Sequence, residues 1–583
     1  MPRVKTEIVS SRTGHPVPVV QGVTLHSRYD PVAEGEAWAA AAADRLKAVV
    51  GAHGRAPLPS PVVLGLGFGY HVRPLVKMLE SSGDGGEGGA GSLVVWEPRR
   101  EIALAAKAEG ALDDIRTRIR LISGRNPPAD VLKETPAECV LVHEPSSRLD
   151  PGLYDAYRGQ FSNRGRGFRV LVVGPLYGGT LEIAGYAANA LRTLGHEAER
   201  LDFSKLAGPF HAVNDVTKEP AHRNKLNALY AQFCSGVVVA RALDFKPDLV
   251  LALAQAPLIP EAIDELRRHG FPVALWFVED FRLMTYWKGL APRYDAIFPF
   301  QSGECLAEME AAGGRHVHYL PVAADPETHR PLALSPEDQG LFGSEVSFMG
   351  AAYYNRRRML TGLLDFDFKI WGSDWPSAGP LARVVQRGGA RVSAEECAKI
   401  YNATEVNVNL HSSSYHEGVN PVGDSVNPRT FEIAACGAFQ LVDRRSLLPD
   451  LFGEDEMATF EDLEKLRDGV RRYLADPEAR AAMAGRARAR VLAEHTYAHR
   501  MAEMLGFLTT RGVLKPSAGS DGYERVEDLV RQAGRESEIG TYLSRFKDRE
   551  RISLDEIAAD IRKGGGTLSR TESLLLLLKE LGG

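Results

Sequence analysis

The side chains best suited to chemistry lie between Asp424 and Asp443. The stretch D-S-V-N-P-R-T-F-E-I-A-A-C-G-A-F-Q-L-V-D predicts a polar loop, a helix that begins at Pro428 and stops at Gly437, and then a strand. Proline fits the first helical position, where its missing N–H costs nothing, and glycine fits the position after the last turn. The unpaired N–H groups and partial positive charge of this helix start suit a phosphate.

Two side chains of the predicted helix extend this site. Arg429 places a planar fork of donors on the first turn. Glu432 lies one turn further on, where its carboxylate could accept two hydroxyls of a ribose. A helix start for a diphosphate with a carboxylate for the sugar indicates a nucleotide-sugar site. The alternative is a capped surface helix with an internal ion pair.

The same stretch resembles the C-terminal signature of glycosyltransferases with the two-Rossmann (GT-B) architecture, in which two acidic residues flank seven others. Here they are Asp424 and Glu432, so Asp stands in place of the usual Glu. The run N-P-R-T-F-E-I-A-A-C-G-A-F is more similar to the spore-maturation CgeB-like branch. The resemblance implies an α/β fold with two Rossmann-like domains facing a cleft, and a retaining sugar transfer.

The donor half is expected at residues 336–510. Its predicted strands end at Gly350, at Gly372 and just before His411, and glycine at the first of these ends could approach the diphosphate. Asp365 and Asp367 form a metal-binding D-x-D pattern but precede their strand, at the end opposite the expected site. The expected donor contacts are Gly350, Arg356, Arg357, Gly372, Ser373, His411, Asp424, Asn427, Arg429, Thr430 and Glu432.

The acceptor half is expected at residues 166–335. Apolar runs at crossover spacing predict a parallel sheet whose ligands lie beyond the carboxyl ends of the strands. The loop with Tyr177, Gly178 and Gly179 follows the first strand, and Asp280 follows a later one. Asp280 could orient or deprotonate an acceptor hydroxyl, or it could cap the next helix. The predicted strands are 170–173, 247–257, 272–280, 295–300 and 316–322.

A further Rossmann-like domain is expected at residues 1–160. Gly65, Gly67 and Gly69 follow a predicted strand, and Glu97 ends the next one, where a carboxylate could bind a ribose. The glycine-rich insert at 83–91 predicts a flexible surface loop. The pattern Gly-x-Gly-x-Gly at Gly65, Gly67 and Gly69, with Glu97 downstream, resembles the cofactor site of S-adenosylmethionine-dependent methyltransferases. T-L-H-S-R-Y-D-P-V-A-E-G together with G-L-G-F-G-Y-H resembles instead the motility accessory factor family, linked to flagellin glycosylation. An active methyltransferase, a nucleotide-binding accessory domain and a purely structural domain all remain open.

Composition narrows the class of protein. A net charge of −6 in 583 residues argues against binding nucleic acid by bulk electrostatics. The five cysteines are scattered, which suits a reducing compartment. The first residues lack the apolar core of a signal peptide, and no long apolar run predicts a membrane span, so a cytoplasmic protein is expected. Residues 511–583 predict a helical tail whose leucines could pack on the body or on another copy.

The sequence therefore predicts transfer of a sugar from a nucleotide-sugar donor, such as a UDP- or GDP-sugar, to a hydroxyl acceptor. Asp280, Arg429 and Glu432 are the predicted catalytic residues, and no metal is expected, because a helix start and arginines can stabilise the leaving diphosphate. The N-terminal resemblance implies a protein acceptor such as flagellin, and a surface glycan is the other candidate acceptor. The alternatives are a sugar-nucleotide 2-epimerase, a non-catalytic scaffold, and a bifunctional protein with an S-adenosylmethionine-dependent methyltransferase domain.

Overall fold

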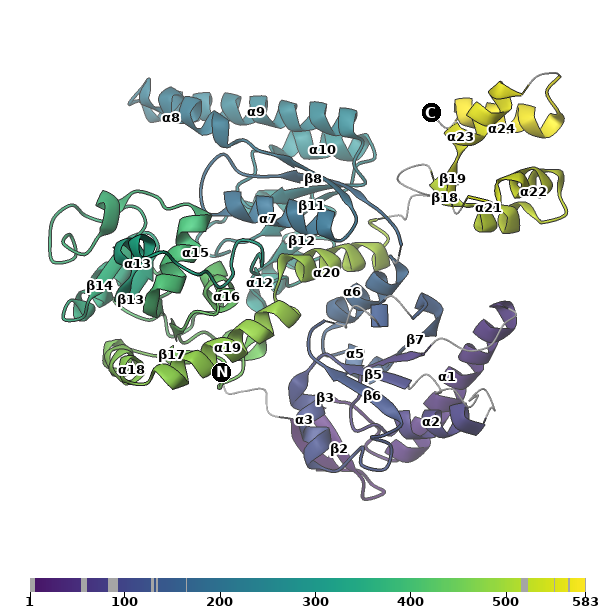
Figure 1. The fold of residues 1–583 in the computed structure, drawn as a ribbon, viewed down its shortest axis with the longest axis horizontal. Coiled ribbons are helices and arrows are strands. Elements are labelled where there is room, and N and C mark those ends of the chain that lie inside the picture. Colours follow the sequence, from purple (N-terminus) through teal and green to yellow (C-terminus); the bar gives the residue numbers. More distant parts are fainter. Residues whose placement is uncertain are drawn as a thin grey trace.

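The computed structural model is an α/β structure built on three parallel sheets, shown in Figure 1. It describes residues 6–53, 60–81, 93–126, 131–132, 135–163, 165–514, 523–549, 551–564 and 567–581. The predicted glycine-rich loop at 83–91 lies outside the described residues.

The first of two five-stranded sheets has the order β12-β11-β10-β8-β9, and we call its domain the first lobe. Every neighbouring pair in it is parallel. Its central strands are fully buried apolar runs, as expected for a sheet covered by helices on both faces. The strands are β8 (Arg169–Val173), β9 (Glu197–Leu201), β10 (Leu249–Leu253), β11 (Val273–Phe277) and β12 (Ala296–Pro299). The helices are α7 (Thr180–Thr193), α8 (Ala207–Asp215), α9 (Pro220–Phe245), α10 (Pro260–Arg268), α11 (Trp287–Leu290) and α12 (Glu304–Ala311).

The second five-stranded sheet has the order β14-β13-β15-β16-β17, and we call its domain the second lobe. It is also parallel throughout. The strands are β13 (Ser344–Met349), β14 (Phe368–Trp371), β15 (Thr404–Asn409), β16 (Gln440–Asp443) and β17 (Ala458–Phe460). The helices are α13 (Pro336–Phe342), α14 (Tyr354–Met359), α15 (Ala394–Ala403), α16 (Pro428–Ala435), α17 (Leu448–Leu451), α18 (Leu463–Ala475) and α19 (Pro477–Glu494).

The N-terminal domain contains a four-stranded parallel sheet of order β6-β5-β4-β7 and a three-stranded antiparallel sheet that the sequence did not predict. The parallel strands are β4 (Val62–Leu64), β5 (Leu93–Glu97), β6 (Ile119–Ser123) and β7 (Val140–Val142). The antiparallel strands are β1 (Glu7–Ser10), β2 (Pro16–Val20) and β3 (Val23–Thr24). The helices are α1 (Pro31–His53), α2 (Val72–Ser81), α3 (Arg100–Ala108), α5 (Glu144–Ser147) and α6 (Pro151–Ser162).

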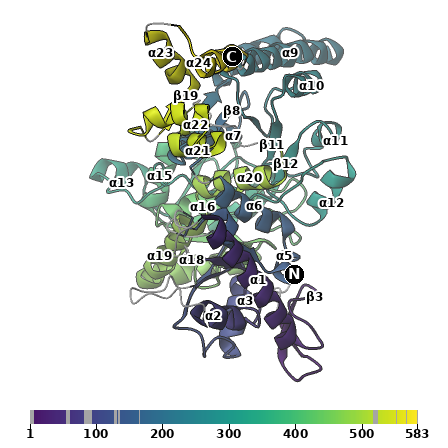
Figure 2. The same ribbon diagram turned by 90° about the vertical axis from the view of Figure 1, so that its right-hand side faces the viewer.

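The helix α20 (Tyr497–Thr510) joins the three domains. It follows α19 of the second lobe, packs against α7 of the first lobe, and packs against α6 of the N-terminal domain. Gly159 of α6 and Gly506 of α20 allow this contact, because a Cβ on Gly159 would lie 1.8 Å from the Gly506 carbonyl oxygen. In Figures 1 and 2, α20 lies between the N-terminal domain below and the first lobe above.

The C-terminal tail is a separate unit with its own small apolar core. It contains the antiparallel pair β18 (Tyr523–Arg525) and β19 (Arg551–Ser553) besides the expected helices. The helices are α21 (Val526–Ala533), α22 (Glu538–Leu543), α23 (Leu554–Lys563) and α24 (Arg570–Leu581). Several leucines of α24 are exposed, so the tail does not bury them against the body in the described part of the chain.

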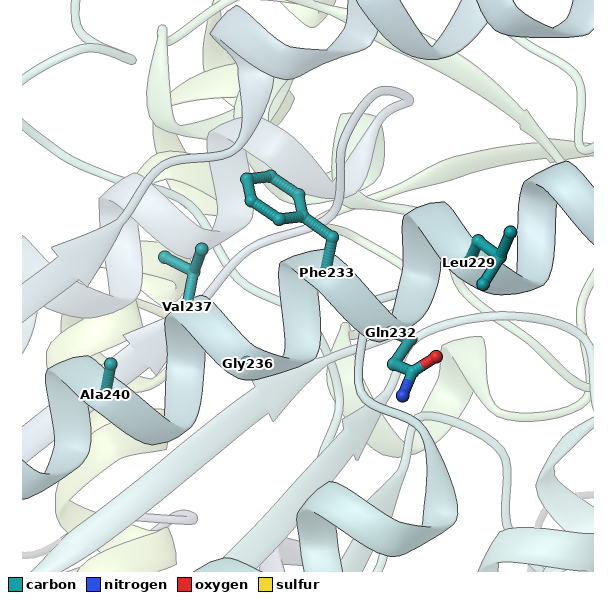
Figure 3. A pocket seen from close by; sticks show the side chains of 6 residues that line it. All are labelled: Leu229, Gln232, Phe233, Gly236, Val237 and Ala240. Atoms are coloured by element: carbon teal, nitrogen blue, oxygen red, sulfur yellow. The ribbon is translucent and has the colours of Figure 1, made fainter.

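Among the described residues, α9 is the one helix long and apolar enough to cross a membrane by length and composition, and the sequence analysis did not single it out. One face packs on the first-lobe sheet. The other exposes Leu229 and Phe233, which lie beside a shallow apolar hollow on the helix (Figure 3).

Two expectations for the first lobe were wrong. Residues 316–322 do not form a strand: only Val317 pairs with the sheet, through a single bridge to Ile297. The edge strand β9 was missed because its sequence, E-A-E-R-L, is charged and only partly buried.

Candidate donor site at the junction of the two lobes

The helix α16 begins at Pro428 and ends at Ala435, close to the predicted limits. Asn427 caps it, because the Asn427 side-chain oxygen accepts the N–H of Thr430 at 3.1 Å. Gly437 follows the last turn with a φ of +67°, which favours glycine. Local sequence signals therefore set both ends of the helix.

A buried amide network holds the start of α16 in place. Asn409 at the end of β15 donates to the Thr430 hydroxyl at 3.0 Å and to the Asn427 side chain at 3.3 Å. Gln440 at the start of β16 donates to the Thr430 carbonyl at 2.7 Å. Thr430 is fully buried, so its hydroxyl serves this network and not the donor, contrary to the prediction for this residue.

His411 lies beneath the helix start and positions it. Its Nε2 accepts the backbone N–H of Asn427 at 2.9 Å, so the ring proton is on Nδ1, which donates to Asp443 at 2.6 Å. Asp443 also accepts the backbone N–H of His411, and Arg445 lies 3.6 Å from its other oxygen. Both ring nitrogens are used, and His411 is 4% exposed, so it is a positioning residue and not the predicted donor contact.

This arrangement predicts a pH dependence of stability. Burial, opposed by Asp443, lowers the pKa of His411 to about 4, below the value of about 6.5 of an unfolded chain. A depressed folded-state pKa gives stability that is present above pH 6.5 and lost as the pH falls toward 4, by at most about 1.4 kcal/mol per pH unit for one group. We expect the melting temperature to fall less steeply over this range in His411→Gln than in the wild type. Parallel curves would contradict this role of His411.

Arg429 lies at the carboxyl ends of two neighbouring strands of the second lobe. Gly350, after β13, has a φ of +151°, and a Cβ there would lie 3.4 Å from Nη2 of Arg429. Gly372, after β14, has a φ of +118°, and a Cβ there would lie 2.6 Å from the Gly350 carbonyl oxygen. Only glycine fits both positions, and together they bring backbone and guanidinium close to one point.

The other predicted contacts on this side have different roles. Arg356 is buried and donates to the carbonyl oxygens of Leu410 and Ala351, so it supports the loops around Gly350. Burial and then the nearby positive charge of Arg429 lower the pKa of Arg356 to about 9. An anion would relieve the repulsion between these two cations. The side chain of Arg357 is exposed, and the Ser373 hydroxyl bonds to Asp374.

Glu432 faces the first lobe. It is half-buried, and its carboxylate accepts the hydroxyl of Tyr401 on α15 at 3.3 Å. Burial and then the charge of Glu432 raise the pKa of Tyr186, which belongs to α7 of the first lobe. The carboxylate lies on α16 one turn beyond Arg429, close enough to Tyr186 of the first lobe to influence its pKa.

The loop before α16 binds the first lobe directly. Asp424 accepts from Gln301 at 2.7 Å and from Arg282 at 3.1 Å. Asp280 accepts the backbone N–H groups of Arg282 and Leu283 in the turn after β11, so it does not cap the next helix, α11, and its other oxygen lies 3.4 Å from the Gln301 amide. Asp280 therefore lies at the junction of the two lobes, and the hydrogen bonds of Asp424 link one lobe to the other.

A second bridge joins the lobes at the predicted glycine loop. Arg391 of the second lobe donates to the Gly178 carbonyl of the first lobe at 2.8 Å. Gly179 is exposed at the start of α7, and Tyr177 is 46% exposed and packs against Phe210 of α8. The loop therefore lies at the junction, as expected.

The glycine loop of the N-terminal domain is occupied by the chain itself. Leu66 N–H donates to Glu97 at 2.8 Å, and Phe68 N–H donates to His26 at 2.9 Å. Glu97 is fully buried and also accepts the N–H of Arg99, so it holds the loop and is closed to a ribose in this structure. Gly65, Gly67 and Gly69 have positive φ, and a Cβ on any of them would collide with a side chain.

Sequence reasoning missed several residues of the donor site. Asn409, Gln440, Asp443, Arg391 and Arg445 act through contacts between strands, loops and lobes. For Asn409, Gln440, Asp443 and Arg445 the one available signal was their polarity at or near a strand end, whereas Arg391 lies in the loop before α15 and gave no signal.

Comparisons with known proteins find a family model that matches much of the second lobe. A family model described as glycosyl transferase-like matches residues 356–506. The spore protein CgeB of Bacillus subtilis (strain 168) is 26% identical over 247 residues, which are 40% of this chain and 75% of that protein. The sucrose-phosphate synthase of Thermosynechococcus elongatus aligns with a TM-score of 0.42 and 15% identity, over 59% of this chain and 99% of the other. Anabaena HepE in complex with UDP and glucose aligns with a TM-score of 0.41 and 12% identity, over 59% and 100%.

The predicted resemblance to CgeB-like glycosyltransferases is thereby confirmed, and the two parallel five-stranded sheets confirm the predicted α/β fold with two Rossmann-like domains. The resemblance of the N-terminal domain to motility accessory factors stays a prediction.

Proposed function

We propose that this chain transfers a sugar from a nucleotide-sugar to a hydroxyl acceptor at the junction of the two lobes. The observation that carries the proposal is the position of Arg429 at Gly350, beside the start of α16. Positive charge at that point stabilises the diphosphate that develops as the sugar leaves. Glu432, one turn further on and facing the first lobe, binds the ribose.

The chemistry assigned to these residues needs no metal ion. The helix start and Arg429 supply fixed positive charge where Mg²⁺ serves in other transferases. Asp280 lies across the junction on the first lobe and is the candidate for orienting the acceptor hydroxyl. The family resemblance implies that the transfer retains the anomeric configuration of the sugar.

A thermal-shift panel of UDP-, GDP-, ADP-, CMP- and dTDP-sugars tests the donor site. We expect one nucleotide to raise the melting temperature selectively, because a ligand at 100 times its Kd stabilises the folded state by about 2.7 kcal/mol. The same ligand should give no shift with Glu432→Ala. If no nucleotide shifts the wild type, the donor assignment fails.

The need for an acceptor distinguishes a glycosyltransferase from a sugar-nucleotide 2-epimerase. A sugar-nucleotide 2-epimerase would release a free epimerised sugar without any acceptor, whereas a transferase hydrolyses its donor only slowly in that case. Quantifying free sugar and nucleoside diphosphate from the donor that binds, with no acceptor added, separates the two activities.

A further inference from the structure

The N-terminal domain contains a cluster of three buried histidines far along the chain from the donor site. We call His26, His71 and His143 the histidine cluster; each is at most 3% exposed. One nitrogen from each ring lies within 4.8 Å of the others. His26 follows β3, His71 precedes α2, and His143 follows β7, so three separate segments converge at the carboxyl edge of the β4–β7 pair.

Hydrogen bonds fix two of the ring tautomers. His71 Nε2 lies 3.1 Å from the Gly65 carbonyl oxygen, which can only accept, so Nε2 carries the proton and Nδ1 has the lone pair. His26 Nε2 accepts the Phe68 N–H, so its lone pair is on Nε2 and its proton on Nδ1. His143 Nδ1 lies 2.7 Å from the Ser146 hydroxyl, which can accept its proton and leave the Nε2 lone pair free.

Two ring nitrogens of the cluster lack a hydrogen-bond partner although they are buried. They are Nδ1 of His71, a lone pair, and Nδ1 of His26, a donor. An unpaired buried polar atom is costly, so such atoms call for a partner. A cation would bind the His71 lone pair. The His26 proton points toward the Glu34 carboxylate, 3.8 Å away, and a carboxylate behind the ring is the usual support of a metal-bound histidine.

The rings are close to, but not in, a coordinating arrangement. With metal–nitrogen distances of about 2.1 Å at a tetrahedral ion, ring centroids lie about 5 Å apart. His26 lies 5.6 Å from His71 and 5.0 Å from His143, centroid to centroid. His71 and His143 are stacked at 4.0 Å and nearly parallel, so coordination requires one of these rings to turn and the pair to separate by about 1 Å.

We propose that the histidine cluster binds one divalent transition-metal ion of the zinc type through His71 Nδ1, His143 Nε2 and His26 Nε2, with the ion taking the His26 lone pair from the Phe68 N–H. Imidazole favours zinc and its neighbours over Mg²⁺ or Ca²⁺, which prefer oxygen ligands. Within the described residues, no fourth His, Cys, Asp or Glu joins the group, so water completes the shell.

The ion would join the three segments that surround the glycine loop. His26 already contacts this loop, because a Cβ on Gly67 would lie 2.3 Å from His26 Nε2. The proposal gives the loop a structural role and is independent of the donor site. The sequence predicted no metal, because its cysteines are scattered and these histidines are far apart along the chain.

The test uses the full untagged chain, so that no affinity-tag histidines bind metal. We expect about one zinc per purified chain by elemental mass spectrometry, none in His71→Phe, which keeps an aromatic ring in the stack, and unchanged content in His269→Phe, an exposed histidine elsewhere. A chelator-treated wild type should regain melting temperature on adding zinc.

A cobalt titration of the chelator-treated wild type tests the site without any variant. Visible d–d absorption that saturates at about one cobalt per chain, and that zinc displaces, supports the proposal. A metal-free purified protein that shows no cobalt absorption and no thermal response to zinc overturns it. Equal metal content in His71→Phe and the wild type also overturns it, because the ion is then bound elsewhere.

Discussion

Replacing Arg429 with methionine is expected to lower the rate of donor cleavage by about 10²–10³-fold, the usual cost of removing one group that stabilises developing charge. The guanidinium lies at Gly350, at the carboxyl end of β13, where the diphosphate is expected. Methionine keeps much of the apolar stem and removes the charge. Nucleoside diphosphate release, measured with the donor that gives the largest thermal shift, reports the effect.

Two further arginine variants make this result specific. Arg429→Lys keeps the charge but loses the planar fork, so its rate should fall between those of the wild type and Arg429→Met. Arg357→Met removes an exposed arginine of the second lobe, next to Arg356 in the chain, and should leave the rate within about twofold of the wild type, since its charge is solvated. Wild-type turnover by Arg429→Met would favour the scaffold alternative.

Loss of rate should exceed loss of affinity in Arg429→Met. The leaving diphosphate carries more charge in the transition state than in the bound donor, and only interactions that strengthen in the transition state raise kcat. Arg356 remains beside Gly350 and retains part of the ground-state attraction. A change confined to KM would show that Arg429 binds the donor uniformly and does not act on the leaving group.

The sequence predicted the part of the donor site whose interacting residues are close together in the sequence. Asn427, Pro428 and Gly437 set the limits of α16 through caps and turns, so the helix and its charged first turn followed from sequence alone. The sheets followed in the same way, because buried parallel strands are apolar runs. The charged edge strand β9 was missed because that rule does not apply at an edge.

The residues that were given a wrong role were assigned from their position in the sequence. Their hydrogen-bond partners, however, come from segments that are distant in the sequence. His411 was expected to bind the donor, but Asp443 and Asn427 use both of its ring nitrogens. Glu97 was expected to bind a ribose, but it accepts N–H groups from the glycine loop. A polar residue at the end of a strand can bind a ligand or support a loop, and only the tertiary contacts distinguish the two.

Removing the Glu503 carboxylate is expected to destabilise the junction of all three domains by about 3–5 kcal/mol, the range for breaking a buried ion pair. Glu503 on α20 is fully buried and accepts from Arg125 of the N-terminal domain at 2.7 Å and from His318 of the first lobe at 2.9 Å. Burial disfavours its charge, but Arg125 and His318 still hold the pKa of Glu503 at about 2. In Glu503→Ala, Arg125 is left largely buried without a counter-ion.

Unfolding by urea, with limited proteolysis of the N-terminal domain, measures the effect of Glu503→Ala. The matched control is Glu197→Ala, which breaks the exposed pair with Arg169 and should cost less than about 1 kcal/mol. Replacing both buried partners, as Arg125→Met with Glu503→Leu, should recover most of the loss, because no charge is then left unpaired. If Glu503→Ala unfolds within 1 kcal/mol of the wild type, or the double variant is no better, the ion pair does not hold the N-terminal domain on α20.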